Sequence, residues 1–202
     1  MKLIHKLCAA ALLFLAALPA IFGGVETYPF DPVHSMVALK IRHVVSRVPG
    51  QFTKVAGTIH YDRENPTQSS VQATIEANSL STNAEKRDNH VKSDAFLDVA
   101  RFPTITFVSR GEWKKTGPDA YEVPGDLTMH GITHPVALQV SLLGFGTTPA
   151  GKHLAGWEAK ATVRKSEFGV NGPAVLSAAL GDDVEVNINI EAILDVPKEN
   201  HE

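Results

Sequence analysis

The sequence has 202 residues, of which 44% are hydrophobic and 20% are charged. This length and composition suit one ordinary globular domain and exclude an intrinsically disordered chain. The formal net charge of -3 also excludes the strongly basic composition typical of nucleic-acid-binding domains, so we expect no nucleic acid among the partners.

The first 24 residues differ from the rest of the chain and are typical of a secretory signal peptide. Met1 to Lys6 is short and basic, and residues 7–22 form an apolar run that ends near small residues. This run is short for a membrane span of about 20 residues, although an uncleaved N-terminal anchor is the alternative. The sequence leaves three cleavage positions open, after Ala20, Gly23 or Gly24. We therefore expect a mature domain over residues 25–202, located in the periplasm or secreted, with no stable membrane insertion after cleavage.

The only cysteine, Cys8, lies within this leader. The mature domain would therefore contain no disulfide, and its core must be sufficient by itself in an oxidising compartment. Removal of Lys2 and Lys6 changes the balance from 19 basic and 22 acidic residues to 17 and 22, a net charge of -5.

Alternation of apolar and polar residues dominates the chain from Val33 onward and predicts strands with one buried face. In the clearest case, apolar side chains from Val184 to Ala192 alternate with Glu and Asn. Short turns are expected between most strands, for example at Val48-Pro49-Gly50 and His130-Gly131. We predict eight strands, around residues 37–43, 55–61, 71–77, 105–107, 121–129, 136–142, 155–163 and 184–192.

One long segment, residues 79–103, does not fit a strand and predicts a short helical insertion between the third and fourth strands. Thr82 and Glu85 have the spacing of a capping box, and Ser93-Asp94 is a candidate start for a second short turn. An apolar group follows at Phe96, Leu97, Val99 and Phe102. We interpret this 79–103 segment as a lid.

Eight strands joined by short turns predict an all-β fold, an up-and-down antiparallel meander that closes into a barrel and so leaves no exposed edges. Gly57, Gly125 and Gly156 fall inside strands, where glycine often marks the bends that closure needs. A barrel of this size either fills its interior with side chains or holds one small ligand.

The predicted interior is apolar and rich in small residues, which indicates room for a long hydrocarbon. Each methylene group transferred there from water would contribute about 0.8 kcal/mol. A packed core is the alternative, because Trp157, Phe107, Tyr61, Tyr121 and Met129 are large enough to offset the small residues. The predicted ligand-lining residues are Leu39, Ile41, His43, Ile59, Ile75, Phe96, Phe107, Leu127, Met129, Leu138, Trp157, Ala159 and Ile188.

Catalytic and metal motifs are weak. His130 and His134 are four residues apart, but they flank a predicted turn and have no evident third ligand, so we predict no metal site. The sequence has no G-x-S-x-G motif, and the mature domain has no thiol nucleophile. We therefore predict no catalytic residues, no enzymatic activity and no cofactor.

Arg87 and His90 are predicted to lie on one helical face at the barrel mouth, where they are candidates for head-group contacts. A guanidinium can hold a phosphate or pyrophosphate in two parallel hydrogen bonds. The alternative is that Arg87 pairs with Asp88, Asp94 or another acid and fastens the lid.

A series of short motifs along the chain resembles the YceI-like family. In order, these are Asp31-Pro-Val-His34-Ser35, Gly50-x-Phe52, Gly57, Ser79-Leu-Ser-Thr82, Arg87-Asp88-x-His90, Pro103-x-Ile105-Thr106-Phe107, Gly125-Asp-Leu127-Thr128-x-x-Gly131, Arg164-x-x-x-Phe168-Gly169 and Gly181-Asp-Asp183-Val184. The resemblance covers about Tyr28 to Leu194. Two departures are Val55, where the family usually has an aromatic residue, and Val91, where a leucine follows the histidine.

The resemblance implies an eight-stranded, lipocalin-like barrel in a secreted or periplasmic protein that holds long-chain amphiphiles. By the same resemblance the ligand would be a polyisoprenoid, an isoprenoid quinone or a fatty amide, carried and not transformed.

Three functional hypotheses follow from the sequence. The first is a carrier or sequestering protein with a long apolar ligand inside the barrel. The second is a stress-response interaction module with a filled barrel and no ligand. The third is an enzyme that uses His43 or His90 as a base on a bound lipid. The sequence leaves open whether two copies form a homodimer.

Overall fold

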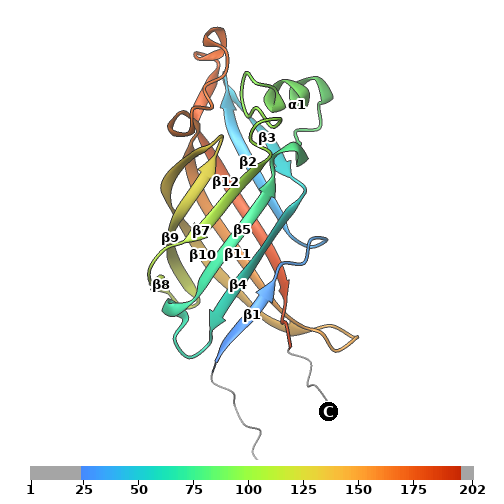
Figure 1. Cartoon of the computed structure of the whole chain (residues 1–202), viewed down its shortest axis with the longest axis vertical. Coiled ribbons are helices and arrows are strands. Elements are labelled where there is room, and N and C mark those ends of the chain that lie inside the picture. The colour runs from blue at the N-terminus through green and yellow to red at the C-terminus, as the bar shows by residue number, and fades with distance from the viewer. Residues whose placement is uncertain (1–23, 197–202) are drawn as a thin grey trace, which may run out of the picture.

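The computed structural model describes residues 24–196 as a single antiparallel sheet with short helices at one end and in its loops (Figure 1). The predicted signal peptide lies outside the described residues, apart from Gly24. The strands are β1 (Val25–Pro29), β2 (Met36–His43), β3 (Ser46–Phe52), β4 (Val55–Asp62), β5 (Ser70–Glu76), β6 (Leu80–Ser81), β7 (Thr104–Ser109), β8 (Lys114–Gly117), β9 (Ala120–Met129), β10 (Ile132–Thr147), β11 (His153–Arg164) and β12 (Leu180–Ile193). The helices are α1 (Glu85–Lys92) and the 3-10 helices η1 (Pro66–Gln68), η2 (Ala77–Ser79), η3 (Lys165–Phe168) and η4 (Ala174–Leu176). In this part of the chain no helix has the length and hydropathy needed to span a membrane.

The all-β antiparallel class is confirmed, but the count of eight strands is not. The sheet has twelve strands in the order β1-β4-β5-β7-β9-β10-β11-β12-β2-β3-β6, with β8 paired to β9 beside this path. Each predicted strand has a counterpart, and β1, β3, β6 and β8 are additional. The turn expected at Val48-Pro49-Gly50 is wrong, because these residues lie within β3. Pro49 is tolerated there because β3 pairs with β6 only at Gln51 and Phe52, which leaves the missing N–H without a required partner.

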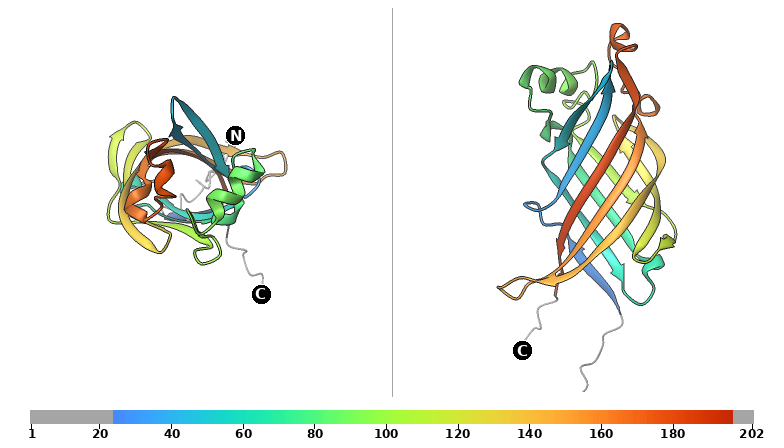
Figure 2. Two further views of the ribbon diagram at one scale, coloured as in Figure 1. Left: turned by 90° about the horizontal axis from the view of Figure 1, so that it is seen from above. Right: turned by 180° about the vertical axis from the view of Figure 1, so that it is seen from behind.

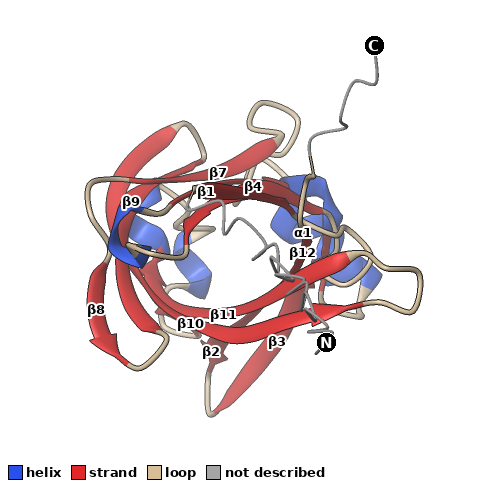
Figure 3. Ribbon diagram, turned by 90° about the horizontal axis from the view of Figure 1, so that it is seen from below, coloured by secondary structure: helices blue, strands red, loops and turns tan. Residues whose placement is uncertain are grey.

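The sheet curls until its first strand reaches β12. Phe30 and Ala192 form an isolated bridge, and the Asp195 N–H donates to the Thr27 carbonyl at 2.8 Å. Views along the long axis show the strands surrounding that axis, from above in Figure 2 and from below in Figure 3. Alternate side chains of each strand therefore face a common interior.

The 79–103 segment contains β6 and α1, and α1 begins without the predicted capping box. The N-cap residue is Ala84, which makes no side-chain cap. The Thr82 N–H instead donates to the Asp88 carboxylate at 2.8 Å, and its hydroxyl donates to the same oxygen. The hydrogen bond from the Thr82 hydroxyl lowers the pKa of Asp88. The second short turn expected at Ser93-Asp94 is confirmed, because residues 94–97 form a turn in which the Ser93 hydroxyl accepts from the Ala95 N–H at 3.3 Å and the Ser93 carbonyl accepts from the Phe96 N–H at 3.1 Å.

Two of the three strand glycines are required by close contacts. A Cβ at Gly57 would lie 2.5 Å from the Gln72 carbonyl oxygen, and one at Gly125 would lie 2.3 Å from the Phe107 ring. A Cβ at Gly156 would meet nothing closer than 3.6 Å. The backbone therefore lies too close to neighbouring atoms for a side chain at Gly57 and Gly125, but not at Gly156.

Gly57→Ala is accordingly expected to destabilise the protein by about 1–3 kcal/mol, because a backbone carbonyl cannot move aside as a side-chain end can. Gly156→Ala on β11 is the matched control and should change the free energy of unfolding by less than about 1 kcal/mol. Urea denaturation of both variants measures the difference. Equal stabilities would contradict the close approach of β4 to β5.

Candidate functional site

A cavity of about 730 Å³ occupies the interior of the curled sheet. Its wall consists almost entirely of aliphatic and aromatic side chains from the inward faces of the strands, for example Ile59 on β4, Leu127 on β9 and Ile188 on β12. This volume lies within the range of about 300–1,000 Å³ that is usual for small-molecule sites. The fully packed interior considered as the alternative is therefore not what the structure has.

The structure places every predicted ligand-lining residue on this cavity, together with both candidate head-group residues. They are Leu39, Ile41, His43, Ile59, Ile75, Arg87, His90, Phe96, Phe107, Leu127, Met129, Leu138, Trp157, Ala159 and Ile188. Their contact with a ligand stays a prediction. Their common location follows from strand alternation, since residues two apart on one strand face the same side.

Large aromatic residues close one end of the cavity. The Trp157 ring packs edge-on against Tyr28, with centroids 5.4 Å apart, and against Tyr61, with centroids 6.1 Å apart. Trp113 packs on Tyr121 at 5.9 Å. Tyr61 and Tyr121, which the sequence offered as fillers of the whole interior, thus fill only this end.

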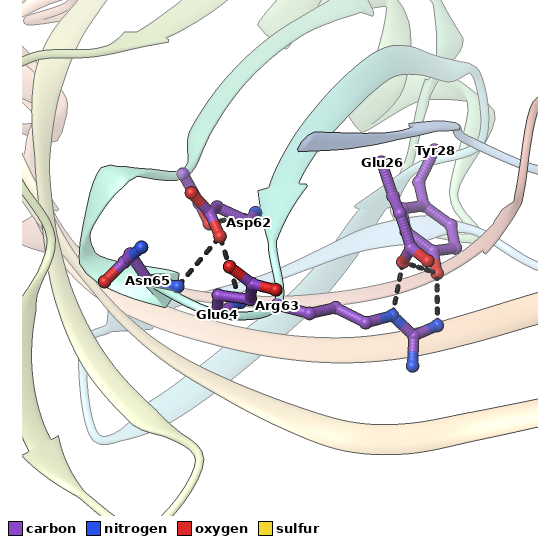
Figure 4. Close-up of polar contacts among 7 residues, drawn as sticks. Glu26, Tyr28, Asp62, Arg63, Glu64 and Asn65 are labelled. Atoms are coloured by element: carbon purple, nitrogen blue, oxygen red, sulfur yellow. Dashed lines mark hydrogen bonds and ion pairs between the residues drawn. The ribbon is translucent and has the colours of Figure 1, made fainter. Parts of the chain in front are cut away.

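A polar network seals the same end from outside (Figure 4). Arg63, in the loop after β4, donates to Glu26 at 2.5 Å and to the Tyr28 hydroxyl at 2.9 Å. Its guanidinium also lies 3.8 Å from the centroid of the Phe145 ring. Burial raises the pKa of Tyr28 to about 12, and the hydrogen bond to Glu26 adds to this effect. The network ties β1 to the β4–β5 loop and to β10, so the closed end is held by three parts of the sheet.

The opposite end of the cavity reaches the surface beneath α1. Phe96 and Leu97 are buried inside this mouth, whereas Lys86, Arg87 and His90 are exposed and still line the cavity. The His90 ring packs edge-on against Phe96 with centroids 5.1 Å apart. Apolar side chains thus form the throat of the mouth, and basic side chains form its rim.

Arg87 is held by Thr82 and not by an acid. Its Nε donates to the Thr82 hydroxyl at 2.7 Å and its Nη2 donates to the Thr82 carbonyl at 2.8 Å. Within residues 24–196 it forms no ion pair, so the expected pairing with Asp88 or Asp94 is not found. Arg87 therefore fixes the start of α1 while keeping its positive charge uncompensated by a contacting carboxylate.

Sequence reasoning missed a second group of mouth residues that follows β11. Lys165 on η3 lines the cavity with its side chain only 13% exposed, and its Nζ donates to the Asn171 carbonyl at 3.4 Å. Leu176 and Leu180 line the cavity from the neighbouring loop. These residues do not alternate between apolar and polar, and nothing in the sequence around Lys165 predicts that it lies at the mouth.

The model of the YceI-like domain matches residues 28–192, which is most of the chain. The chain belongs to the YceI-like family. A UPF0312 protein of Pectobacterium atrosepticum is 37% identical over 172 residues, which cover 82% of this chain and 85% of that protein. A UPF0312 protein of Pseudomonas syringae pv. tomato is 35% identical over 185 residues, which cover 90% of this chain and 96% of that protein.

Solved structures share the YceI-like fold at low sequence identity. BcnA of Burkholderia cenocepacia superposes with a TM-score of 0.74 at 22% identity, covering 81% of this chain and 99% of BcnA. The YCEI protein of Campylobacter jejuni has a TM-score of 0.66 at 24% identity, covering 75% of this chain and 88% of that chain. A polyisoprenoid binding domain from Saccharophagus degradans has a TM-score of 0.62 at 13% identity, covering 83% of this chain and 98% of that domain.

The first YceI-like motif has a structural role at the β1–β2 loop. Asp31 accepts a hydrogen bond from the Val33 N–H at 2.8 Å and lies 3.0 Å from His34 Nδ1, while Ser35 donates to the Glu191 carbonyl at 3.1 Å. The bond with His34 lowers the pKa of Asp31, and the same contact raises the pKa of His34. The motif therefore attaches the loop to β12 on the outside of the sheet, away from the cavity mouth.

Proposed function

We propose that this YceI-like protein is an exported binding protein that carries or sequesters one long-chain apolar ligand in its cavity. The observation that supports this most directly is the 730 Å³ apolar cavity, closed at the aromatic end and open beneath α1. At roughly 30 Å³ for a water-sized group, this volume accommodates about 24 such groups, which is the scale of a long hydrocarbon chain. The candidate ligands are a polyisoprenoid, an isoprenoid quinone and a fatty amide.

The comparison with the Saccharophagus degradans domain supports the isoprenoid class, because that neighbour is described as polyisoprenoid binding. The ligand would enter with its tail toward Trp157 and keep its polar head at the mouth. Arg87 and His90 are the proposed head-group contacts, and Lys86 and Lys165 add two further cations on the same cavity. Within residues 24–196, the second terminal nitrogen of Arg87 has no hydrogen-bond partner and is free to donate to a head group.

The proposed location is the periplasm, or outside the cell. It rests on the basic and apolar leader of residues 1–24 and on the absence of cysteine from the rest of the sequence.

The enzyme hypothesis has less support from the geometry. His43 and His90 are both exposed at the mouth, and within residues 24–196 neither ring forms a hydrogen bond to a carboxylate that would orient it as a base. The description of the Saccharophagus degradans neighbour as polyisoprenoid binding supports a binding role over a catalytic one.

Extraction of the purified protein with organic solvent, followed by mass spectrometry, tests the proposal directly. We expect one long-chain lipid at close to one molecule per protein. An empty protein that also takes up no added isoprenoid or fatty amide would contradict the proposed function.

Affinity should also depend on chain length. In a series of n-alkyl amides, each added methylene is expected to strengthen binding by about 0.8 kcal/mol, roughly fourfold, until the cavity is filled. Competition with a fluorescent fatty-acid probe measures the series. An affinity independent of chain length would show that the head group, and not the cavity, determines binding.

A further inference from the structure

The mouth of the cavity is surrounded by exposed apolar side chains on two adjoining loops. Val44 and Val45 form the tip of the β2–β3 hairpin and are 54% and 97% exposed, and Val175 on η4 is 85% exposed. The Val44 N–H donates to the Ala179 carbonyl at 2.7 Å, which joins the hairpin to the η4–β12 loop. Figure 1 shows both loops at the same end of the molecule as α1. Three valines therefore project from the mouth and not from scattered sites.

The turn of the β2–β3 hairpin has valine at a position where its backbone conformation disfavours a β-branched residue. The tip is a two-residue turn between the paired residues His43 and Ser46, a position where glycine and asparagine are strongly preferred. Val44 has φ +52°, and for a β-branched residue this left-handed conformation is strained. An apolar tip that is both strained and exposed indicates a use for the apolar surface itself.

The same two loops also line the cavity. Leu176 and Leu180 face the cavity while Val175, next to Leu176, faces away from the protein. On the hairpin, His43 and Val48 line the cavity on either side of the exposed tip. An apolar surface laid against these loops would therefore be continuous with the apolar wall inside.

Basic side chains accompany these valines. Arg42 lies beside the tip and donates to the Val44 carbonyl at 3.2 Å, and Lys86 and Arg87 are exposed on α1. Within residues 24–196 none of the three forms an ion pair, whereas Glu185, Glu167 and Asp182 near the same end each contact a basic residue. Within the described residues these three cations therefore remain available to contact anionic groups, although Glu85 and Asp94 of the α1 segment are also exposed and form no ion pair.

From this arrangement we infer that the mouth docks on the surface of an anionic lipid bilayer. The valines insert among the acyl chains at the interface, and Arg42, Lys86 and Arg87 contact anionic head groups. The inference rests on the proposed function for its purpose, because a docked mouth lets an apolar ligand pass between bilayer and cavity without crossing water.

Flotation with vesicles of phosphatidylethanolamine and phosphatidylglycerol tests the inference without any cavity ligand. The wild-type protein is expected to float with these vesicles and to bind several-fold less to phosphatidylcholine vesicles. Val44→Gly combined with Val45→Asn suits the turn better than the native residues, because only the first turn residue has a positive φ, so misfolding would not explain a loss of binding. We expect this variant to bind at least about tenfold more weakly, and Arg42→Gln to bind about fivefold more weakly.

Val33→Asp is the matched control, because Val33 is 80% exposed in the β1–β2 loop, at the end of β2 farthest from the mouth. It should bind vesicles as the wild type does. The inference is overturned if the wild type does not float, if the Val44/Val45 variant floats equally well, or if Val33→Asp loses binding to the same extent. Uptake of a lipid probe in vesicle-free buffer separates the two ideas, since uptake without flotation would refute docking and leave the proposed function intact.

Discussion

Ala159→Trp is expected to remove most of the bound lipid. Ala159 lies on β11, faces the cavity and is flanked across the sheet by Val140 and Ile188. An indole at this position would occupy the middle of the space available to a chain. Exclusion of only three methylene groups would cost about 2.4 kcal/mol, roughly sixtyfold in affinity. Lipid content by mass spectrometry and affinity by probe competition measure the effect.

Lys160→Trp is the matched control for this substitution. Lys160 is the next residue on β11 and is exposed on the outer face, where it pairs with Gln139 and Asn187. The same added side chain should leave the lipid content unchanged there. Ala73→Trp on β5 provides a second block from another part of the cavity wall. Normal lipid content in both Ala159→Trp and Ala73→Trp, with circular dichroism showing a folded protein, would place the ligand outside the cavity.

The cavity wall was predictable from the sequence because strand geometry alone decides it. In β12, Val184, Val186, Ile188 and Ile190 alternate with polar residues, and all four face the cavity. No knowledge of the neighbouring strands is needed for this inference, since alternation is a property of each strand.

The division of the interior into a filled end and an open end was not predictable. Tyr61 and Ile59 are two residues apart on β4 and face the same side, yet Tyr61 packs in the aromatic end and Ile59 lines the cavity. Which side chains meet depends on the register between strands, for example on the pairing of Gly57 with Ala73, and register is a long-range property. The additional strand β3 was missed for a related reason, because Pro49 is compatible with a strand only where one neighbour is missing.

The structure of the mouth was not predictable from the sequence, because local hydrogen bonds there replace those of the expected motifs. Thr82 has the spacing of a capping box with Glu85, but the Asp88 carboxylate accepts hydrogen bonds from both the Thr82 N–H and the Thr82 hydroxyl. The residues after β11 were missed because 3-10 turns have no extended periodicity, so Lys165 gave no sign of lining the cavity.

Phe168→Ala is expected to cause the largest loss of stability. Phe168 is completely buried on η3, and the His134 ring packs edge-on against it with centroids 5.3 Å apart. Its carbonyl accepts a hydrogen bond from His130 Nδ1 at 3.2 Å, which ties η3 to the β9–β10 turn. Removal of a buried phenylalanine ring typically costs about 3–5 kcal/mol, and for a chain of this size that corresponds to a fall in Tm of roughly 10 °C. Urea denaturation and calorimetry measure both quantities.

Phe145→Ala is the matched control, since Phe145 is 44% exposed at the closed end and its removal leaves a smaller cavity. It should cost less than half as much as Phe168→Ala, even though it also removes the contact with Arg63. Because Phe168 does not line the cavity, Phe168→Ala should retain its ligand affinity at temperatures where it remains folded. Similar stability losses in the two variants would contradict the prediction, because they would show that the buried Phe168 ring stabilises the fold no more than the half-exposed Phe145 ring.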